Sequence, residues 1–179
     1  MNYIIRQEQK KDYEETEQVI KAAFAHEKQS DQDEHHLVSR IRKSEFFVPE
    51  LSLIAVAKNT EKILGHVLLS KILIDNPNNG KIESLALAPV SVLPADQNQG
   101  IGKAMIQKAL KKATELGFYS VVVLGHPEYY PKFGFHQASL WQIKAPFDVP
   151  EEALMIKELK EGALNKVSGV IEYPSIFFG

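Results

Sequence analysis

The loop between residues 92 and 103 holds the residues best suited to chemistry. It contains Gly100 and Gly102, and glycines let a ligand approach the backbone closely. A helical pattern follows, and the first N–H groups of a helix have no partner inside it, while its dipole adds positive charge there. Anions bind at such helix starts. We therefore predict a phosphate site in this loop, with Asp96 pointing away from the phosphate.

The spacing of the glycines restricts which phosphate compound fits. The loop lacks the G-x-x-x-x-G-K-[ST] pattern of P-loop nucleotide sites. It also lacks the third glycine of the dinucleotide pattern G-x-G-x-x-G, because Met105 stands at that position. A plain strand–loop–helix unit, with glycines for tight turning, stays open as an alternative.

The sequence offers four side chains as candidate bases. His126 follows a buried strand, where α/β sheets bind ligands, and a pKa near ~6.5 suits a base. A loop histidine without a catalytic role is the alternative. His66 lies inside a strand pattern, which favours a buried, hydrogen-bonded core histidine over a catalytic one. Glu83 and Glu128 complete the set.

A strand–helix–strand unit must position the loop. Residues 82–92 read as a strand that is apolar with few interruptions from Leu85 to Val92, as expected where both sheet faces are covered. Residues 101–116 carry apolar side chains at intervals of three and four, which predicts an amphipathic helix with Gly117 as its C-cap. Residues 118–124 read as a second buried strand. Because a helix separates them, the two strands should be parallel, with a right-handed crossover.

The whole chain predicts an α/β (α+β) fold with a mixed, mostly antiparallel sheet. The second and third strands should form a hairpin, the last two should lie at the end of the sheet, and Ser30 should cap the second helix. No linker or repeat divides the sequence, so residues 1–179 are expected to form one domain. The remaining strands are predicted at 2–6, 51–58, 63–74, 153–159 and 167–173, and the remaining helices at 11–26 and 30–44.

Composition excludes several classes of protein. A net charge of −2 argues against an extended nucleic-acid surface. The absence of cysteine excludes disulfides, thiolate metal sites and a cysteine nucleophile. His35 and His36 are adjacent and diverge in a helix, so no metal site is expected. With no apolar run near the roughly 18 residues of a membrane span and no apolar signal core, we expect a cytoplasmic protein without a membrane partner.

Two motifs resemble a known family. Residues 92–103 spell V-x-P-x-x-Q-x-x-G-x-G-K, which resembles the acyl-CoA pyrophosphate loop of the GNAT acetyltransferase superfamily. Residues 130–135 match its Y-x-K-x-G-F signature, in the same order and at a similar distance. The strings LGHPEYYPKFGF, GHVLL at 65–69, LAPVSVLP at 87–94 and the stretch 153–173 look closer still to the YhbS-like branch of predicted N-acetyltransferases.

The resemblance implies a splayed parallel strand pair, helices on both sheet faces and a CoA site. Backbone groups of Val90, Ser91 and Val92 should pair with the pantetheine arm as if it were an added strand. Tyr130 falls at the position of the general acid. The N–H groups expected to bind the pyrophosphate belong to Gln97, Asn98, Gln99, Gly100, Ile101, Gly102 and Lys103.

The chain also departs from the family pattern. Positions 97–99 read Gln-Asn-Gln where relatives often carry arginine or lysine, so backbone donors must bind the phosphates with less help from side-chain charge. The frequent glutamate base of the central strand is absent, because residues 86–90 hold no carboxylate.

The resemblance implies an N-acetyltransferase that moves the acetyl group of acetyl-CoA to an amine by direct transfer in a ternary complex. Tyr130 favours this enzyme, whereas the missing strand carboxylate favours a non-catalytic acyl-CoA sensor, which stays open. The amine acceptor is not identified by the sequence, and a homodimer is one open oligomeric state.

Overall fold

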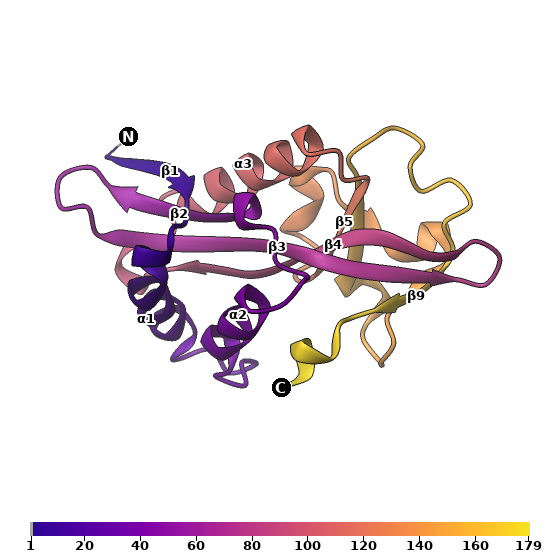
Figure 1. The fold of residues 1–179 in the computed structure, drawn as a ribbon, viewed down its shortest axis with the longest axis horizontal. Coiled ribbons are helices and arrows are strands. Elements are labelled where there is room, and N and C mark those ends of the chain that lie inside the picture. Colours follow the sequence, from indigo (N-terminus) through magenta and orange to yellow (C-terminus); the bar gives the residue numbers. More distant parts are fainter. Residues whose placement is uncertain (1) are drawn as a thin grey trace.

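The computed structural model describes residues 2–179, which build one sheet with helices on both faces (Figure 1). The strand order is β1-β2-β3-β4-β5-β8-β6, with β9 beside β3 and β7 beside β9. The helices are α1 Tyr13–Phe24, α2 Glu34–Arg42 and α3 Ile101–Glu115. The strands are β1 Tyr3–Gln7, β2 Ser52–Ala57, β3 Ile63–Asn76, β4 Gly80–Val92, β5 Ser120–Leu124, β6 His136–Gln137, β7 Ile143–Lys144, β8 Leu154–Glu158 and β9 Gly169–Glu172.

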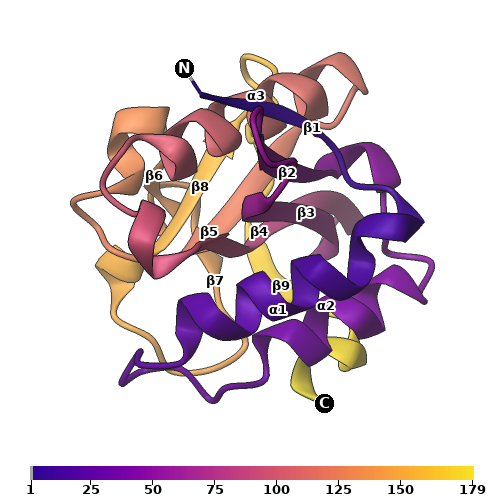
Figure 2. The same ribbon diagram turned by 90° about the vertical axis from the view of Figure 1, so that its left-hand side faces the viewer.

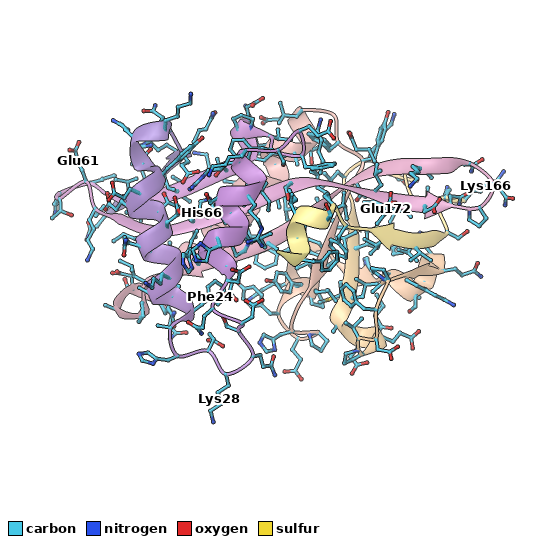
Figure 3. All side chains as sticks on the ribbon, turned by 60° about the horizontal axis from the view of Figure 1, so that its bottom comes forward. Phe24, Lys28, Glu61, His66, Lys166 and Glu172 are labelled. Atoms are coloured by element: carbon cyan, nitrogen blue, oxygen red, sulfur yellow. The ribbon has the colours of Figure 1, made fainter. Side chains whose placement is uncertain are left out.

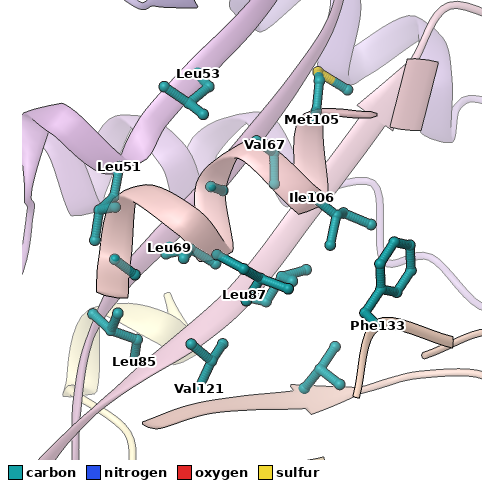
Figure 4. Close-up of a cluster of buried hydrophobic side chains, with 14 of the residues drawn as sticks. Leu51, Leu53, Val67, Leu69, Leu85, Leu87, Met105, Ile106, Val121 and Phe133 are labelled. Carbon is teal, nitrogen blue, oxygen red and sulfur yellow. The ribbon is translucent and has the colours of Figure 1, made fainter. Parts of the chain in front are cut away.

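The sheet separates two hydrophobic layers. Helix α3 covers one face, and α1 and α2 cover the other (Figure 2). Alternate residues of each strand point to opposite faces, so Val67 and Leu69 pack against α3 while Leu68 packs against α1 and α2. Figure 4 shows Met105 and Ile106 of α3 over the strand residues of the first layer. The predicted amphipathic helix and buried central strand are confirmed.

Strands β4 and β5 are parallel neighbours, as predicted, but they pair over a short distance. Only Leu85 with Val121 and Ala86 with Val122 are partners in the ladder. Beyond them β4 continues to Val92 without β5. On its other side β4 has a bulge, since Ala88 and Pro89 lie between the pairs that Leu87 and Val90 make with β3. The carboxyl half of β4 therefore has one free edge.

The predicted cap of the second helix is wrong. Helix α2 begins at Glu34, with Asp33 rather than Ser30 in the N-cap position. The Ser30 hydroxyl instead hydrogen-bonds the Glu34 carboxylate, with an Oγ–Oε1 distance of 2.7 Å. The backbone N–H of Asp33 donates to the Asp31 side chain. Local turn hydrogen bonds thus delay the helix by one turn.

The last two strands do not both lie at the end of the sheet. Strand β8 pairs with β5, as expected of an end strand, but β9 pairs with Leu73–Asp75 of β3. Strand β3 is longer than β2, which leaves this part of its edge free. Gly169 allows the approach, because a Cβ there would collide with the carbonyl oxygen of Asp75. The chain after β9 then runs toward α2 (Figure 1).

The chain after β9 is fastened to α2. It ends in a short 3₁₀ helix, η7 Ser175–Phe178, that lies beside α2 (Figure 1). Arg40 of α2 donates from Nε to the carbonyl oxygen of Ile176 over 2.8 Å. Ile176 and Phe177 also pack against the hydrophobic layer under α2. This anchor fixes the aromatic side chains of the segment in place.

His66 is a buried, hydrogen-bonded residue, as the sequence favoured. It lies on the face of β3 that α1 and α2 cover (Figure 3), with its Nε2 2.9 Å from the Ser52 hydroxyl. That hydroxyl donates to Glu8, so Nε2 is the donor toward Ser52. Arg42 pairs with the same Glu8 carboxylate at 2.6 Å. Burial lowers the pKa of His66 to about 4, which keeps the ring neutral at pH 7.

Within residues 2–179, no helix is long and apolar enough to cross a membrane.

Candidate active site

A polar cavity of about 530 Å³ lies between the end of β4 and the start of α3. We call it the loop cavity. Gly100 is the N-cap of α3 at φ +82°, a left-handed conformation that glycine adopts without strain. The lining residues are Val90, Val92, Asp96, Gln97, Asn98, Gly100, Ile101, Gly102, Lys103, Tyr129 and Lys132.

The backbone of the loop cavity offers free donors. The first hydrogen bond inside α3 runs from the N–H of Ala104 to the carbonyl of Gly100 over 3.0 Å. The N–H groups of Ile101, Gly102 and Lys103 therefore have no partner inside the helix. The Gln97 side chain turns back and donates to the carbonyl of Val92 over 3.1 Å, so it fixes the loop. An anion in this cavity would meet chiefly backbone donors and the helix dipole.

Gly102 borders open space in the cavity. A Cβ on this residue would lie 3.7 Å from the Val92 side chain and 3.9 Å from the Tyr129 hydroxyl, which are ordinary contacts. A side chain at position 102 would therefore occupy the room of a ligand without distorting the loop.

Side-chain charge in the loop cavity is positive. Lys103 and Lys132 line it, against the one carboxylate of Asp96 among the lining residues. The sequence predicted that Asp96 points away from the phosphate, but the structure places this residue at the cavity. The Lys132 ammonium lies 3.9 Å from the centre of the Tyr129 ring, within cation–π range. Sequence reasoning missed Tyr129 and Lys132 as lining residues. The signal was present, since Lys132 belongs to the motif at residues 130–135 and Tyr129 directly precedes it.

Tyr130 lies behind Tyr129, at the start of the 3₁₀ helix η4 Tyr130–Phe133. Its ring packs edge-on against Tyr129 at 5.0 Å and Phe135 at 5.8 Å between centroids. It also lies on Gly125, where any side chain would collide with it. Burial, with a smaller contribution from Tyr129, raises the pKa of Tyr130 to about 12. Its hydroxyl thus stays protonated at neutral pH and can donate a hydrogen bond.

Three of the four candidate bases, all except His66, are exposed. His126 orients the tyrosines only through its main chain, because its carbonyl accepts the N–H groups of Tyr129 and Tyr130. Glu128 is exposed too, and Glu83 lies 4.0 Å from Lys71 across the hairpin. None of these three side chains lines either cavity beside β4. Within residues 2–179, no cluster of three or more potential ligands could hold a metal ion.

A second cavity beside β4, of about 170 Å³, lies where β4 and β5 part. We call it the aromatic cavity. Ala86 and Val122 belong to the hydrophobic layer opposite α3, which places this cavity across the sheet from the loop cavity. A larger cavity of about 740 Å³, between β7, β9 and residues 145–151, shares Phe147 with it. The residues that line the aromatic cavity are Ala86, Leu87, Ala88, Val122, Leu124, Phe147, Tyr173, Phe177 and Phe178.

A family model identifies this arrangement. The model of the acetyltransferase (GNAT) family matches residues 5–135, which include β4, the loop cavity and the tyrosine segment. The chain belongs to this family. The predicted resemblance is thereby confirmed, and so is the expected fold, with its mixed sheet and one parallel pair.

Relatives of the GNAT family agree with this result. The chain is 29% identical over 145 residues to the Escherichia coli protein called Uncharacterized N-acetyltransferase YhbS, covering 80% of this chain and 83% of YhbS. It is 31% identical over 144 residues to Uncharacterized N-acetyltransferase YjhQ of Escherichia coli, covering 80% and 75% of the two chains. The predicted YhbS-like resemblance is confirmed.

Solved GNAT structures have the same fold. The crystal structure of Escherichia coli YhbS in complex with CoA matches with a TM-score of 0.87 at 24% identity, covering 100% of this chain and 93% of YhbS. A GNAT family acetyltransferase from Brucella melitensis in complex with acetyl-CoA matches with a TM-score of 0.80 at 29% identity, covering 98% and 97%.

Proposed function

We propose that this chain is an N-acetyltransferase that transfers the acetyl group of acetyl-CoA directly to a primary amine. The observation that carries the proposal is the loop cavity, where three free N–H groups and two lysines meet beside the unpaired edge of β4. The relatives crystallised with CoA and acetyl-CoA support it. We further propose that residues 1–179 form one catalytic domain that acts in the cytoplasm; the first and last strands belong to the same sheet.

The loop cavity fits the pyrophosphate of CoA. The N–H groups of Ile101, Gly102 and Lys103 supply donors at the positive end of α3, and Lys103 and Lys132 add charge. Beyond the short ladder with β5, the backbone groups of Val90, Ser91 and Val92 have one free edge. An extended pantetheine arm would pair there as an added strand does. Its thioester would then lie at the point where β4 and β5 part.

Transfer moves one acyl group and one proton. The amine nitrogen bonds to the thioester carbonyl carbon, the C–S bond breaks, and the proton lost by the nitrogen completes the CoA thiol. With a pKa of about 12, Tyr130 would transfer its own proton to a thiolate of pKa ~8.5 only at a cost on the order of 5 kcal/mol. We therefore assign Tyr130 the role of hydrogen-bond donor to the leaving sulfur.

A non-catalytic acyl-CoA sensor is the second candidate. One observation favours it: among residues 2–179, no carboxylate or imidazole lines the aromatic cavity, where a base would meet an acceptor amine. An enzyme instead needs an amine that is already uncharged, yet fewer than one alkyl ammonium in about a thousand has lost its proton at pH 7.

Thiol release separates the two candidates. An enzyme converts acetyl-CoA to free CoA slowly alone and faster when a suitable amine is added, with one acetylated amine formed per thiol. A sensor binds CoA in a calorimeter and releases no thiol with any member of a broad panel of primary amines. That second outcome would refute the proposed transfer.

A further inference from the structure

The aromatic cavity adjoins the reaction point of the proposed function. Ala86 and Val122 form the last pair between β4 and β5, and both line the cavity. Ala88 lines it too, two residues before Val90, which lines the loop cavity. The two cavities therefore approach β4 from opposite faces at neighbouring positions. A group in the aromatic cavity would be within reach of a thioester held along β4.

The lining of the aromatic cavity is apolar. Its nine residues are four aromatic and five aliphatic side chains, and none carries a charge. Tyr173 contributes the one side-chain hydroxyl, and burial raises its pKa to about 12, so it too stays uncharged. Moving a charged group into such surroundings without a partner is costly. A polyamine or an aminoglycoside would find no carboxylate there.

The aromatic side chains form a connected wall. Phe147 stacks on Tyr173, with a centroid distance of 5.9 Å and an interplanar angle of 20°. Phe178 meets Phe147 edge-on at 6.5 Å. Phe147 remains 42% exposed and Phe178 65% exposed, which is unusual for large aromatic residues that only support a core. The hydrogen bond from Arg40 to Ile176 holds this wall against α2.

The volume restricts the size of the occupant. At about 170 Å³, the cavity is close to the engineered apolar protein cavity of about 150 Å³ that binds benzene. It would thus hold one ring or a branched alkyl group of similar size. A whole peptide would have to extend out of it.

We propose that the acceptor is a small primary amine joined through a short chain to one aromatic ring or a compact apolar group, which binds in the aromatic cavity. This inference rests on the proposed function. The ring would stack among Phe147, Tyr173 and Phe178 while the amine points toward β4. The apolar surroundings disfavour the ammonium form and so raise the share of neutral amine, the form that attacks the thioester. Desolvation would thereby replace part of the work of the absent carboxylate base.

The test compares amines that differ only in the apolar group. Thiol release is measured with phenethylamine, ethylamine, putrescine and a short lysine peptide. We expect kcat/KM for phenethylamine to exceed that for ethylamine at least tenfold, because the ring fills the cavity. Phe178→Ala and Phe147→Ala should each lower this ratio at least threefold. Leu140→Ala is the matched control: Leu140 is 70% exposed, lies outside the aromatic cavity, and should leave the ratio unchanged.

Calorimetry with CoA shows whether each variant is folded. Faster transfer to putrescine or to the lysine peptide than to phenethylamine would overturn the inference and leave the proposed function intact. A ratio that Phe147→Ala and Phe178→Ala both leave unchanged would overturn it as well.

If no amine accelerates thiol release, the proposed transfer fails. The inference is then judged by NMR-detected binding of phenethylamine to the CoA-loaded protein. Binding that Phe178→Ala weakens supports the aromatic cavity as an amine site, and no binding overturns it.

Discussion

The loop cavity and the aromatic cavity flank the same strand, but they are built in opposite ways. The loop cavity is polar, and nine of the eleven residues that line it lie between positions 90 and 103. The aromatic cavity is apolar and draws on β4, β5, residue 147 and the segment from 173 to 178. Backbone donors dominate the first, and side chains make up the second. A phosphate site of this kind can be encoded by one short stretch of sequence. A site for the acceptor depends instead on segments that only the tertiary structure brings together.

The largest effect is expected from removing the hydroxyl of Tyr130, which is not among the residues that line either cavity. Tyr130→Phe keeps the aromatic packing and should lower turnover by roughly 10²-fold, the usual size of the loss when one preorganised hydrogen-bond donor is removed, with CoA affinity nearly unchanged. With a pKa of about 12, Tyr130 stays protonated up to pH ~11, so wild-type turnover should not fall between pH 8 and 10 through loss of this donor. Stopped-assay turnover over that pH range and CoA calorimetry measure both effects.

Turnover equal to wild type with a good acceptor would assign Tyr130 to packing alone. The ring contacts with Tyr129, Phe133 and Phe135 would then account for the tyrosine at this position.

The second test places a negative charge in the loop cavity. Gly102→Asp should weaken CoA binding by about 2 kcal/mol, roughly thirtyfold, because its carboxylate would meet the pyrophosphate at close range. Gln107→Asp adds the same charge to an exposed position of α3 outside the cavity and should change the affinity little. Equal affinities of wild type and Gly102→Asp would mean that the pyrophosphate binds elsewhere.

Charge, and not steric crowding, is the reason for this expectation. A new Cβ at position 102 leaves ordinary distances to its neighbours, so crowding of the free loop is not the cause. Gly102→Ala should accordingly unfold without CoA at a temperature no lower than that of wild type, because alanine has a higher helix propensity than glycine.

The third test measures the contribution of side-chain charge. Lys132→Met should lower CoA affinity about fivefold and reduce its dependence on salt, because one exposed cation near a phosphate is a modest, screened attraction. Lys111→Met removes an exposed cation of α3 outside the cavity and serves as the control. Identical salt dependence in wild type and Lys132→Met would show that the backbone donors act without this lysine.

The sequence predicted the loop cavity and the strands around it because their signals are local. Glycines, apolar runs and a helix start at residues 82–117 need no distant partner to be interpreted. Ser30 was wrong as a cap because the run Ser30–Asp33 offers several side chains that can accept from the backbone, and only packing selects among them. Strand β9 pairs with the part of β3 that extends beyond β2, and the difference in length between these two strands cannot be predicted from a local pattern.

The aromatic cavity could not be predicted from the sequence for a related reason. Phe147 lies far before Tyr173 in the sequence, and Phe178 ends the short 3₁₀ helix that follows Tyr173. The three rings meet because β9 pairs with β3 and Arg40 binds the segment after β9. His126 and Tyr130 as catalytic residues remain predictions. His126 is exposed and lines neither cavity. We therefore favour desolvation of the amine over proton removal by His126 as the source of the neutral nucleophile.

The smallest expected effect comes from Tyr129, and it separates the two adjacent tyrosines. Tyr129 lines the loop cavity, whereas Tyr130 packs behind it against Gly125. Tyr129→Phe removes one neutral hydroxyl donor and keeps the ring under Lys132, so it should weaken CoA binding about threefold, as one uncharged hydrogen bond would. Turnover at saturating acetyl-CoA should stay near that of wild type. Titration calorimetry and saturation kinetics on both single variants give the two numbers. A large loss of turnover in Tyr129→Phe, with Tyr130→Phe active, would reverse the assignment: the donor to the sulfur would then be the tyrosine that lines the loop cavity, and Tyr130 would only support it.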